Sequence, residues 1–444
     1  MNKLAIFLFG IDFVKAIFKK IVLFSISILF FLNGYAQVPS PGAQQSEPIA
    51  IMNGFAHLGN GEVIENSLIT FKNGKLEHVL DATTSKFDLT KYKQIDAAGK
   101  HVYPGLILVM TEVGLKEIEA VRATLDMKEV GDIKPHVRSA IAFNTDSELI
   151  PTMKFNGIQI VQSIPIGGRI PGTSSVMQLD AWNWEDALYL EDDAVHLNWP
   201  SKTRAPKSDQ GETTRQPNEK FAEQKKELIQ LFEDTKAYME VSPKVLNLKL
   251  AAMKGVVSGD TRLFVCVNRA DDIIDAVQTL TELAVPKVVL VGVREILPVK
   301  NLVKESGYPV VLDNVHRLPG SADDPVDWVY RQPAMLVETG IPFCLSYLTS
   351  NDYSSIRNLA FLAGTATAYG VDKETALSLV TLNAAKILGI DDKTGSLESG
   401  KDANILISEG DILDMRTNIL IYSFIQGRAV DLNGLQQRLY QKYK

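Results

Sequence analysis

Residues 381–408 read TLNAAKILGIDDKTGSLESGKDANILIS. The helical pattern of residues 373–388 ends inside this stretch, and the strand-like run 403–408 follows after a group of glycines. Short apolar runs of the same character lie near the other end of the chain, between residues 49 and 95, where Asn73-Gly74 separates two of them. Asn-Gly between alternating apolar residues is a strong hairpin signal. Two β pieces at opposite ends of the chain therefore predict one composite β domain built by both ends.

The middle of the chain alternates strand patterns with helical patterns. The strand candidates are 158–161, 263–267, 288–291, 310–312 and 343–345, and the helical patterns include 271–284, 358–369 and 373–388. Repeated strand-then-helix units with almost continuous apolar strands are typical of a parallel sheet covered by helices. This pattern predicts an α/β barrel or a doubly wound sheet. Residues 200–218 are polar and predict an exposed loop or a disordered insertion, and residues 219–240 predict a long charged helix packed by one apolar stripe.

The composition is that of an ordinary globular protein, with 45% hydrophobic and 22% charged residues in a chain of 444. The chain has 46 Lys and Arg against 53 Asp and Glu, a formal net charge of −7, so we expect no nucleic-acid partner. Two cysteines, Cys266 and Cys344, are too few for a disulfide scaffold. A single bridge between them is one alternative, but both lie in apolar runs, which favours burial as small hydrophobic residues.

The N-terminus has the pattern of a targeting segment. The apolar run 21–32 follows Lys15, Lys19 and Lys20 and precedes a small-residue stretch ending at Ala36. This order is typical of a secretory signal peptide, which predicts export to the periplasm or the exterior after cleavage near Ala36. An uncleaved membrane anchor is the alternative, because the residues upstream of the run are also apolar. The polar residues 37–48 predict a disordered lead-in.

Two motifs resemble the amidohydrolase superfamily, and in particular its imidazolonepropionase-like members. The first is His-Val-Tyr-Pro-Gly-Leu-Ile at residues 101–107, and the second is the stretch 381–404, with Asn404 in place of the usual Asp. The resemblance implies a metal-dependent hydrolase fold: a (β/α)8 TIM-like barrel over 104–397, with the polar insertion 200–218, and a small composite β-sandwich formed by 49–103 and 398–433. A C-terminal helix would occupy residues 434–444. The activity that the resemblance implies is hydrolysis of non-peptide carbon–nitrogen bonds such as those of cyclic amides.

The metal-binding frame departs from the family pattern. In members that hydrolyse C–N bonds, Asp-x-His-x-His ends the first barrel strand and both imidazoles bind a divalent metal, whereas here Leu108, Met110 and Glu112 occupy those three positions. The family's Asp after the last strand is replaced by Tyr347 or Leu348. A thioether is a poor ligand for zinc, and of the three first-strand positions only Glu112 keeps suitable chemistry. We therefore expect no resident metal; an active enzyme would need a divalent metal such as zinc at an altered site.

A displaced site would have to use other side chains. The candidates for catalysis are His136, Asp146, His316 and Asp352, of which the two histidines lie in polar loops after strand candidates. For each histidine the plainer alternative is a surface or capping role. No Gly-x-Ser-x-Gly or His-Glu-x-x-His motif occurs in the chain, so a serine hydrolase or zincin is not supported.

Two further stretches predict a binding surface. The glycine-rich loop 167–175 contains Arg169 and Ser174 and would present backbone N–H groups and a guanidinium to an anion, although a plain turn is the simpler interpretation. Trp182 lies in a stretch with two tryptophans, for which core packing is the default and an aromatic ligand wall the alternative.

Two functional hypotheses follow. The first is an exported amidohydrolase-like enzyme with an altered metal site around Glu112. The second is a catalytically inactive relative that binds a small molecule or a protein partner, either as a homo-oligomer or by pairing with an active homologue. Fold alone does not decide between them, because function depends on the site.

Overall fold

The computed structural model describes residues 40–444, apart from residues 85, 208–210, 242–244, 321–322 and 349–352. The predicted signal peptide, the beginning of the predicted lead-in and Asp352 therefore lie outside the described residues. Among the described helices, none is both long and apolar enough to span a bilayer.

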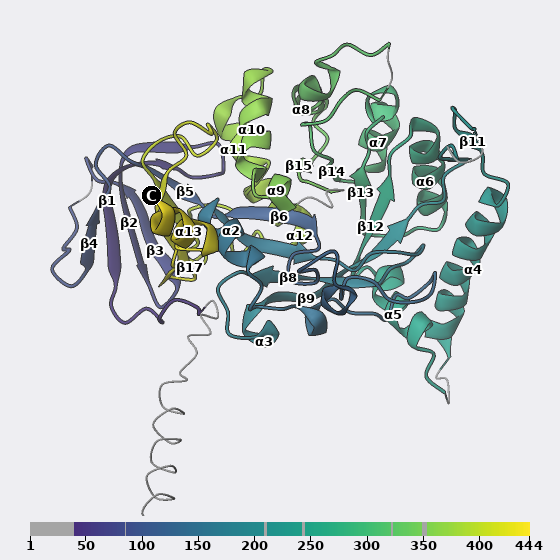
Figure 1. Cartoon of the computed structure of the whole chain (residues 1–444), viewed down its shortest axis with the longest axis horizontal. Coiled ribbons are helices and arrows are strands. Elements are labelled where there is room, and N and C mark those ends of the chain that lie inside the picture. The colour runs from purple at the N-terminus through teal and green to yellow at the C-terminus, as the bar shows by residue number, and fades with distance from the viewer. Residues whose placement is uncertain (1–39, 85, 208–210, 242–244, 321–322, 349–352) are drawn as a thin grey trace, which may run out of the picture. The chain divides into compact units, whose positions relative to one another are not determined.

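One sheet combines strands from both ends of the chain (Figure 1). Its order is β18-β17-β16-β5-β1-β2-β3, with β4 beside β1. The strands are β1 (Ile49–His57), β2 (Val63–Lys72), β3 (Lys75–Asp81), β4 (Lys93–Asp96), β5 (His101–Pro104), β16 (Ile405–Ser408), β17 (Leu420–Ile425) and β18 (Arg428–Ala429). Asn73 and Gly74 join β2 to β3 with φ angles of 50° and 78°, the left-handed conformations that a two-residue hairpin turn requires. Strand β16, which ends the stretch 381–408, pairs antiparallel with β5.

The second sheet forms the barrel, in the order β15-β14-β13-β12-β9-β8-β7-β6. Its strands are β6 (Leu106–Thr111), β7 (Ile158–Ser163), β8 (Thr173–Gln178), β9 (Leu188–Asn198), β12 (Arg262–Val267), β13 (Val288–Gly292), β14 (Val310–Leu312) and β15 (Phe343–Leu345). The predicted TIM-like barrel is confirmed as a nearly closed eight-stranded sheet. The Ser346 hydroxyl donates a hydrogen bond to the carbonyl of Val109 and bridges the two ends of the order. Strand β8 departs from the regular pattern, because it runs antiparallel to both β7 and β9.

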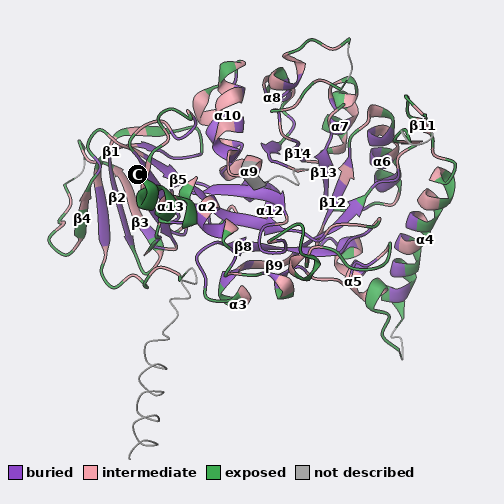
Figure 2. Ribbon diagram, in the orientation of Figure 1, coloured by how far each residue is buried: buried purple, intermediate pink, exposed green. Residues whose placement is uncertain are grey.

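Helices follow most of the parallel strands in the second half of the barrel. They are α2 (Leu149–Phe155), α3 (Trp184–Ala187), α4 (Phe221–Glu240), α5 (Leu248–Ser258), α6 (Ala270–Glu282), α7 (Lys300–Ser306), α8 (Trp328–Thr339), α9 (Tyr353–Ile356), α10 (Leu359–Ala368), α11 (Lys373–Ser378), α12 (Leu382–Leu388) and α13 (Leu435–Tyr443). Helix α4 confirms the predicted charged helix and buries Leu228, Phe232 and Tyr238. The polar insertion is partly ordered, since β10 (Thr203–Arg204) pairs with β11 (Gln216–Pro217). Figure 2 shows α13 as an exposed helix.

The interior of the barrel is mostly apolar. Alternate residues of the parallel strands point inward, and Val109, Phe264, Val291, Val311 and Cys344 form one inner cluster, while the residues between them pack outward against the helices. This is the packed interior expected of a β/α barrel. Both cysteines are free. Cys344 is fully buried, as expected of a small hydrophobic side chain, whereas Cys266 is only half-buried.

Candidate functional site

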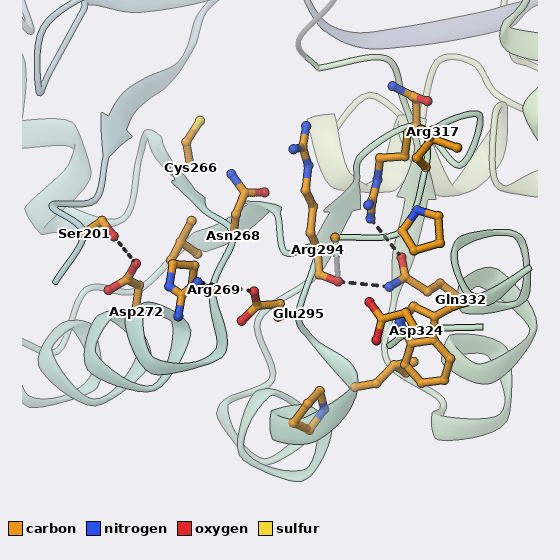
Figure 3. Close-up of a pocket in the computed structure, with 18 of the residues that line it drawn as sticks. Ser201, Cys266, Asn268, Arg269, Asp272, Arg294, Glu295, Arg317, Asp324 and Gln332 are labelled. Atoms are coloured by element: carbon orange, nitrogen blue, oxygen red, sulfur yellow. Dashed lines mark hydrogen bonds and ion pairs between the residues drawn. The ribbon is translucent and has the colours of Figure 1, made fainter. Parts of the chain in front are cut away.

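A cavity of about 1010 Å³ opens at the carboxyl ends of the barrel strands (Figure 3). We call it the mouth cavity. Its wall includes residues that follow three neighbouring parallel strands: Asn268 after β12, Arg294 after β13 and Asn314 after β14. Binding and catalytic residues of β/α barrels lie at this face, because its loops vary without disturbing the barrel. The position and size of the cavity make it the candidate functional site.

Two arginines in the mouth cavity are held by neighbouring polar groups. Arg294 donates to Oδ2 of the buried Asp313 from Nε at 2.8 Å and from Nη2 at 2.6 Å. Gln332 on α8 contacts both arginines (Figure 3). Its Nε2 donates to the carbonyl of Arg294 at 2.9 Å, and its Oε1 accepts a long hydrogen bond of 3.4 Å from Nη2 of Arg317. These contacts fix two guanidinium groups on one wall of the cavity.

Arg317 is the less compensated of the two. Its Nε is buried without a hydrogen-bond partner, and it forms no ion pair with any residue that the structure describes. Burial and then the positive charge of Arg294 lower the pKa of Arg317, and the charge of Asp313 opposes this only in part. Since a guanidinium loses hydration when it is buried, its unmet donors favour an anionic partner from outside the chain.

Two carboxylates of the cavity wall contact the start of α6 or belong to it: Asp272 is a residue of α6, and Glu295 lies in the loop after β13. Asp272 accepts hydrogen bonds from the Ser201 hydroxyl at 2.6 Å and from the Lys202 amide at 2.9 Å. Glu295 accepts from the Ala270 amide at 3.0 Å and lies 3.7 Å from Arg269. These two carboxylates are therefore used to position loops around the cavity.

Cys266 and Asn314 complete the wall. Burial, assisted by the negative charge of Asp313, raises the pKa of the Cys266 thiol to about 12. A thiol with so high a pKa stays protonated near neutral pH and is a poor nucleophile. Oδ1 of Asn314 is buried and has no hydrogen-bond partner among the described residues, so it is an acceptor left for a ligand or a water molecule.

The residues at the family's metal positions do not fit a divalent metal. Met110 is 4% exposed and packs in the inner apolar cluster, and Leu108 belongs to the outer core. Tyr347 is also buried, with its hydroxyl 3.0 Å from Nδ1 of His316. Burial raises the pKa of the half-buried Glu112, an effect that Lys116 reduces and Glu119 increases. Over the described residues, no group of three or more His, Cys, Asp and Glu side chains is arranged to hold a metal ion.

The predicted catalytic residues lie apart from one another. His136 lines a separate hollow of about 380 Å³, and its buried Nδ1 has no hydrogen-bond partner. Asp146 is an exposed loop residue whose amide donates to Oδ1 of Asn144 at 3.0 Å. His316 is exposed, and its Nε2 lies 2.7 Å from the Thr365 hydroxyl. None of these three, nor Glu112, lines the mouth cavity.

The predicted binding residues are also dispersed. Arg169 is held by Glu227 at 2.5 Å and by Asp132 at 2.9 Å, and lines a small hollow of about 310 Å³. Ser174 is buried in β8 and donates to Asp193 at 2.7 Å. Trp182 is 69% exposed, so the default expectation of core packing was wrong for it. The cause is the reversal of β8, which sends the chain that follows it to the amino end of the barrel.

Sequence reasoning missed the arginines of the mouth cavity and one buried histidine. The sequence did contain a signal for this cavity, because a polar residue lies within two positions of the end of each of three neighbouring apolar strands. These residues are Asn268, Arg294 and Asp313. His196 on β9 points into the barrel, because Ala194 belongs to the inner cluster and Val195 and Leu197 to the outer core. Both of its ring nitrogens are buried without a hydrogen-bond partner.

Comparison with known proteins supports the family assignment. Residues 272–433 match the sequence pattern of the Amidohydrolase family. An imidazolonepropionase of Thermoplasma volcanium is 35% identical over 88 residues, which are 19% of this chain and 21% of that protein. The chain thus matches about a fifth of the length of this curated relative.

Solved structures share the fold. An amidohydrolase from Thermotoga maritima superposes with a TM-score of 0.74 at 21% identity, covering 86% of this chain and 99% of that one. A Xaa-Pro dipeptidase gives a TM-score of 0.55 at 13% identity over 86% of this chain and 100% of that chain. A molinate hydrolase gives 0.54 at 14% identity over 89% and 96% of the two chains. Taken with the motifs at residues 101–107 and 381–404, these matches show that the chain carries an amidohydrolase-family domain over residues 272–433, on the barrel fold of the solved amidohydrolases.

Proposed function

We propose that the mouth cavity binds a small molecule with an anionic group, and that the chain is a ligand-binding relative of the amidohydrolases without their metal centre. The observation that carries this proposal is the half-buried guanidinium of Arg317 in the cavity wall: its buried Nε has no hydrogen-bond partner, and the positive charge of Arg294 lies near it. A carboxylate matches the planar fork of a guanidinium and accepts two hydrogen bonds from it. Such a ligand would supply the acceptor that Nε of Arg317 lacks.

The donor chemistry at the metal positions supports the same proposal. Hydrolysis in the family needs a metal-activated water and a carboxylate that moves its proton. Met110 and Tyr347 supply neither an imidazole nor a carboxylate, and Met110 is part of an apolar cluster instead. The described chain therefore provides a shaped, charged cavity beside a barrel interior that lacks the family's ligands.

Binding of a carboxylate by the intact protein tests the proposal. N-carbamoylglycine, which carries a carboxylate and a ureido C–N bond, should bind with a measurable Kd by isothermal titration calorimetry, and its neutral amide should bind at least about tenfold more weakly. Arg317→Met should abolish this binding while leaving the free energy of unfolding equal or higher, because it removes a buried, poorly paired charge. Arg416→Gln, which changes an exposed arginine paired with Asp414, serves as the matched control. Equal affinity for the acid and the amide would refute the proposal.

A second candidate is a hydrolase of non-peptide C–N bonds with an altered metal site. The family domain and the hydrolase names of the relatives favour it. Its residues would be Glu112 with His136, Asp146, His316 or Asp352, and its cofactor a divalent metal such as zinc.

Metal analysis separates the two candidates. The purified protein is incubated with zinc or manganese, dialysed and analysed for bound metal, and turnover of cyclic amides is measured in parallel. A stoichiometric metal that is lost in Glu112→Ala, together with turnover, would establish the hydrolase. Absence of both, with carboxylate binding intact, would establish the binding protein.

We also propose that the chain is exported and that it assembles either with a second copy or with an active homologue. The apolar run 21–32 and the small residues up to Ala36 support export. Sequencing the N-terminus of the protein recovered from its native compartment tests cleavage after Ala36, and light scattering of that material tests self-association.

A further inference from the structure

A second hollow lies at the amino end of the barrel, on the face opposite to the mouth cavity. It has a volume of about 670 Å³ and is lined where four parallel strands begin: by Arg262 at the start of β12, Val288 at the start of β13, Pro309 before β14 and Phe343 at the start of β15. Helix α12 contributes Asn383, Lys386 and Ile387, and the end of α7 and the residues after it contribute 306–308. We call it the amino-end hollow. The mouth cavity and its proposed ligand play no part in it.

Apolar side chains make up much of its wall. Three prolines, three aliphatic residues and two aromatic residues line it: Pro286, Pro309, Pro342, Val288, Val289, Ile387, Tyr308 and Phe343. A concave surface of this composition favours a ligand with an apolar body, because it removes apolar area from water on both sides of the contact.

Three cations lie around the same hollow, and no aspartate or glutamate lines it. They are Arg262, Lys287 and Lys386, and none of the three forms an ion pair within the described ranges. Lys287 and Lys386 are exposed, whereas Arg262 is half-buried. The charge of Arg262 does reach Asp193, but the oxygens of that carboxylate accept hydrogen bonds from Ser174 and Gln162. Lys287 and Lys386 therefore remain available to a ligand, and Arg262 adds positive charge beside them although Asp193 offsets part of it.

The position of Arg262 depends on Gly389. That glycine ends α12 with a φ of 71°, and a Cβ atom there would overlap the guanidinium of Arg262. The missing side chain leaves room for the guanidinium at the rim of the hollow. Gly389 belongs to the same stretch, 381–408, that identifies the fold, so the backbone that ends this helix also places the cation.

We propose that the amino-end hollow is a binding site for a small amphipathic anion, an aromatic or aliphatic carboxylate. Its apolar body would pack on the prolines and Phe343, and its carboxylate would lie among Arg262, Lys287 and Lys386. A neutral apolar molecule would leave the cations without a partner, and a highly polar anion would leave the apolar wall uncovered. The combination of both surfaces selects the amphipathic anion.

Calorimetric titration of the intact protein with 4-phenylbutyrate tests this site. We expect binding that is at least about tenfold tighter than that of the neutral 4-phenylbutyramide and that weakens as salt is raised. The double variant Lys287→Glu/Lys386→Glu should weaken phenylbutyrate binding about tenfold while leaving the melting temperature unchanged, because both lysines are exposed. The control is the double variant Lys72→Glu/Lys91→Glu, which makes the same change of charge at two exposed lysines outside the barrel. It should change the Kd for phenylbutyrate less than twofold.

Each contrary outcome overturns the proposal. Equal binding of acid and amide would mean that the cations play no part. The proposed site would be refuted by an unchanged Kd in the double lysine variant, or by the absence of binding at millimolar phenylbutyrate. Loss of phenylbutyrate binding in Arg317→Met would place the ligand in the mouth cavity instead.

Discussion

His196 provides a sharp test of the barrel interior. Its side chain is 2% exposed, its ring lies 5.4 Å from that of Phe264, and neither ring nitrogen has a hydrogen-bond partner. Burial lowers the pKa of His196 from its ordinary value of 6.5 to about 3. The imidazole is therefore expected to stay neutral in the folded protein throughout the range in which an unfolded histidine takes up a proton.

The expected effect on stability follows from proton linkage. Below pH 6.5 the unfolded chain binds a proton at His196 and the folded chain does not. The folded state therefore loses stability as the pH falls below 6.5, and the loss reaches its full size near pH 3, where the folded protein also takes up the proton. The loss amounts to about 1.4 kcal/mol per pH unit well below the unfolded pKa, and to about 2 kcal/mol at pH 5 relative to pH 8.

The perturbation is His196→Leu, which removes the titrating group and the unpaired nitrogens. Equilibrium urea unfolding, followed by tryptophan fluorescence at pH 8 and pH 5, gives the free energy of unfolding of variant and wild type. The difference between them should shift in favour of the variant by about 2 kcal/mol between the two pH values. At pH 8 the variant should already be more stable by about 1 kcal/mol or more, since an unpaired buried polar group is lost.

His196→Gln separates the two effects. It removes the titration but keeps a buried polar side chain, so it should show the same pH-dependent shift without the gain at pH 8. A difference between His196→Leu and wild type that is the same at pH 5 and pH 8 would refute the buried, neutral histidine. A pKa near 6 for His196, measured by NMR, would refute it equally.

Three further substitutions test the rest of the molecule. Met110→His places an imidazole at a family metal position. It should lower the free energy of unfolding by about 2–4 kcal/mol, because it inserts a polar group into an apolar cluster. Elemental analysis of this variant should find no stoichiometric zinc. Asp313→Asn should cost about 2–4 kcal/mol in urea unfolding, since it removes the buried charge that pairs with Arg294 at 2.6 Å; equal stability would show that solvent already compensates the arginine. Glu374→Gln should cost about 1–3 kcal/mol in the same assay, because Glu374 on α11 binds Nδ1 of His57 on β1 at 2.6 Å, and an unchanged midpoint would count against that contact.

The fold was predictable because its decisive signals are local. Asn73-Gly74 specifies a hairpin by backbone conformation alone, and both residues adopt the left-handed φ angles that the turn demands. The stretch 381–408 contains a helix, its terminating Gly389 and the strand that pairs with β5, all of which follow from short-range patterns. The antiparallel β8 was not predictable in this way, because strand direction depends on which neighbour a strand pairs with, and an apolar run does not encode that.

The site was harder to predict because it combines loops that are distant in sequence. Arg294 and Arg317 become neighbours only through Gln332 on α8, a bridge that no spacing rule reveals. Arg169 looked like an anion ligand from its glycine-rich loop, but Glu227 on α4 already binds it. Trp182 looked like a core residue and is exposed, because β8 reverses before it. Local sequence gives the chemistry of a side chain, whereas its partners come from tertiary contacts.

The inner cluster and the mouth cavity differ in chemistry: the inner cluster is apolar and packed, and the mouth cavity is lined by polar loops. Met110 has a φ of 61°, a left-handed conformation that costs a non-glycine residue about 1 kcal/mol, and its amide donates to Oε1 of Gln162 at 3.2 Å. The backbone at Met110, near the end of β6, is thus strained, although the Met110 side chain only packs in the apolar cluster. A strained backbone persists only where its surroundings enforce it, and here the surroundings are core packing rather than a ligand. The polar side chains of the mouth cavity lie instead on the loops after β13 and β14, where the buried Nε of Arg317 has no hydrogen-bond acceptor. Ligand binding in this chain is therefore expected to depend on those loops and to tolerate changes in the barrel interior that would inactivate a metal-dependent relative.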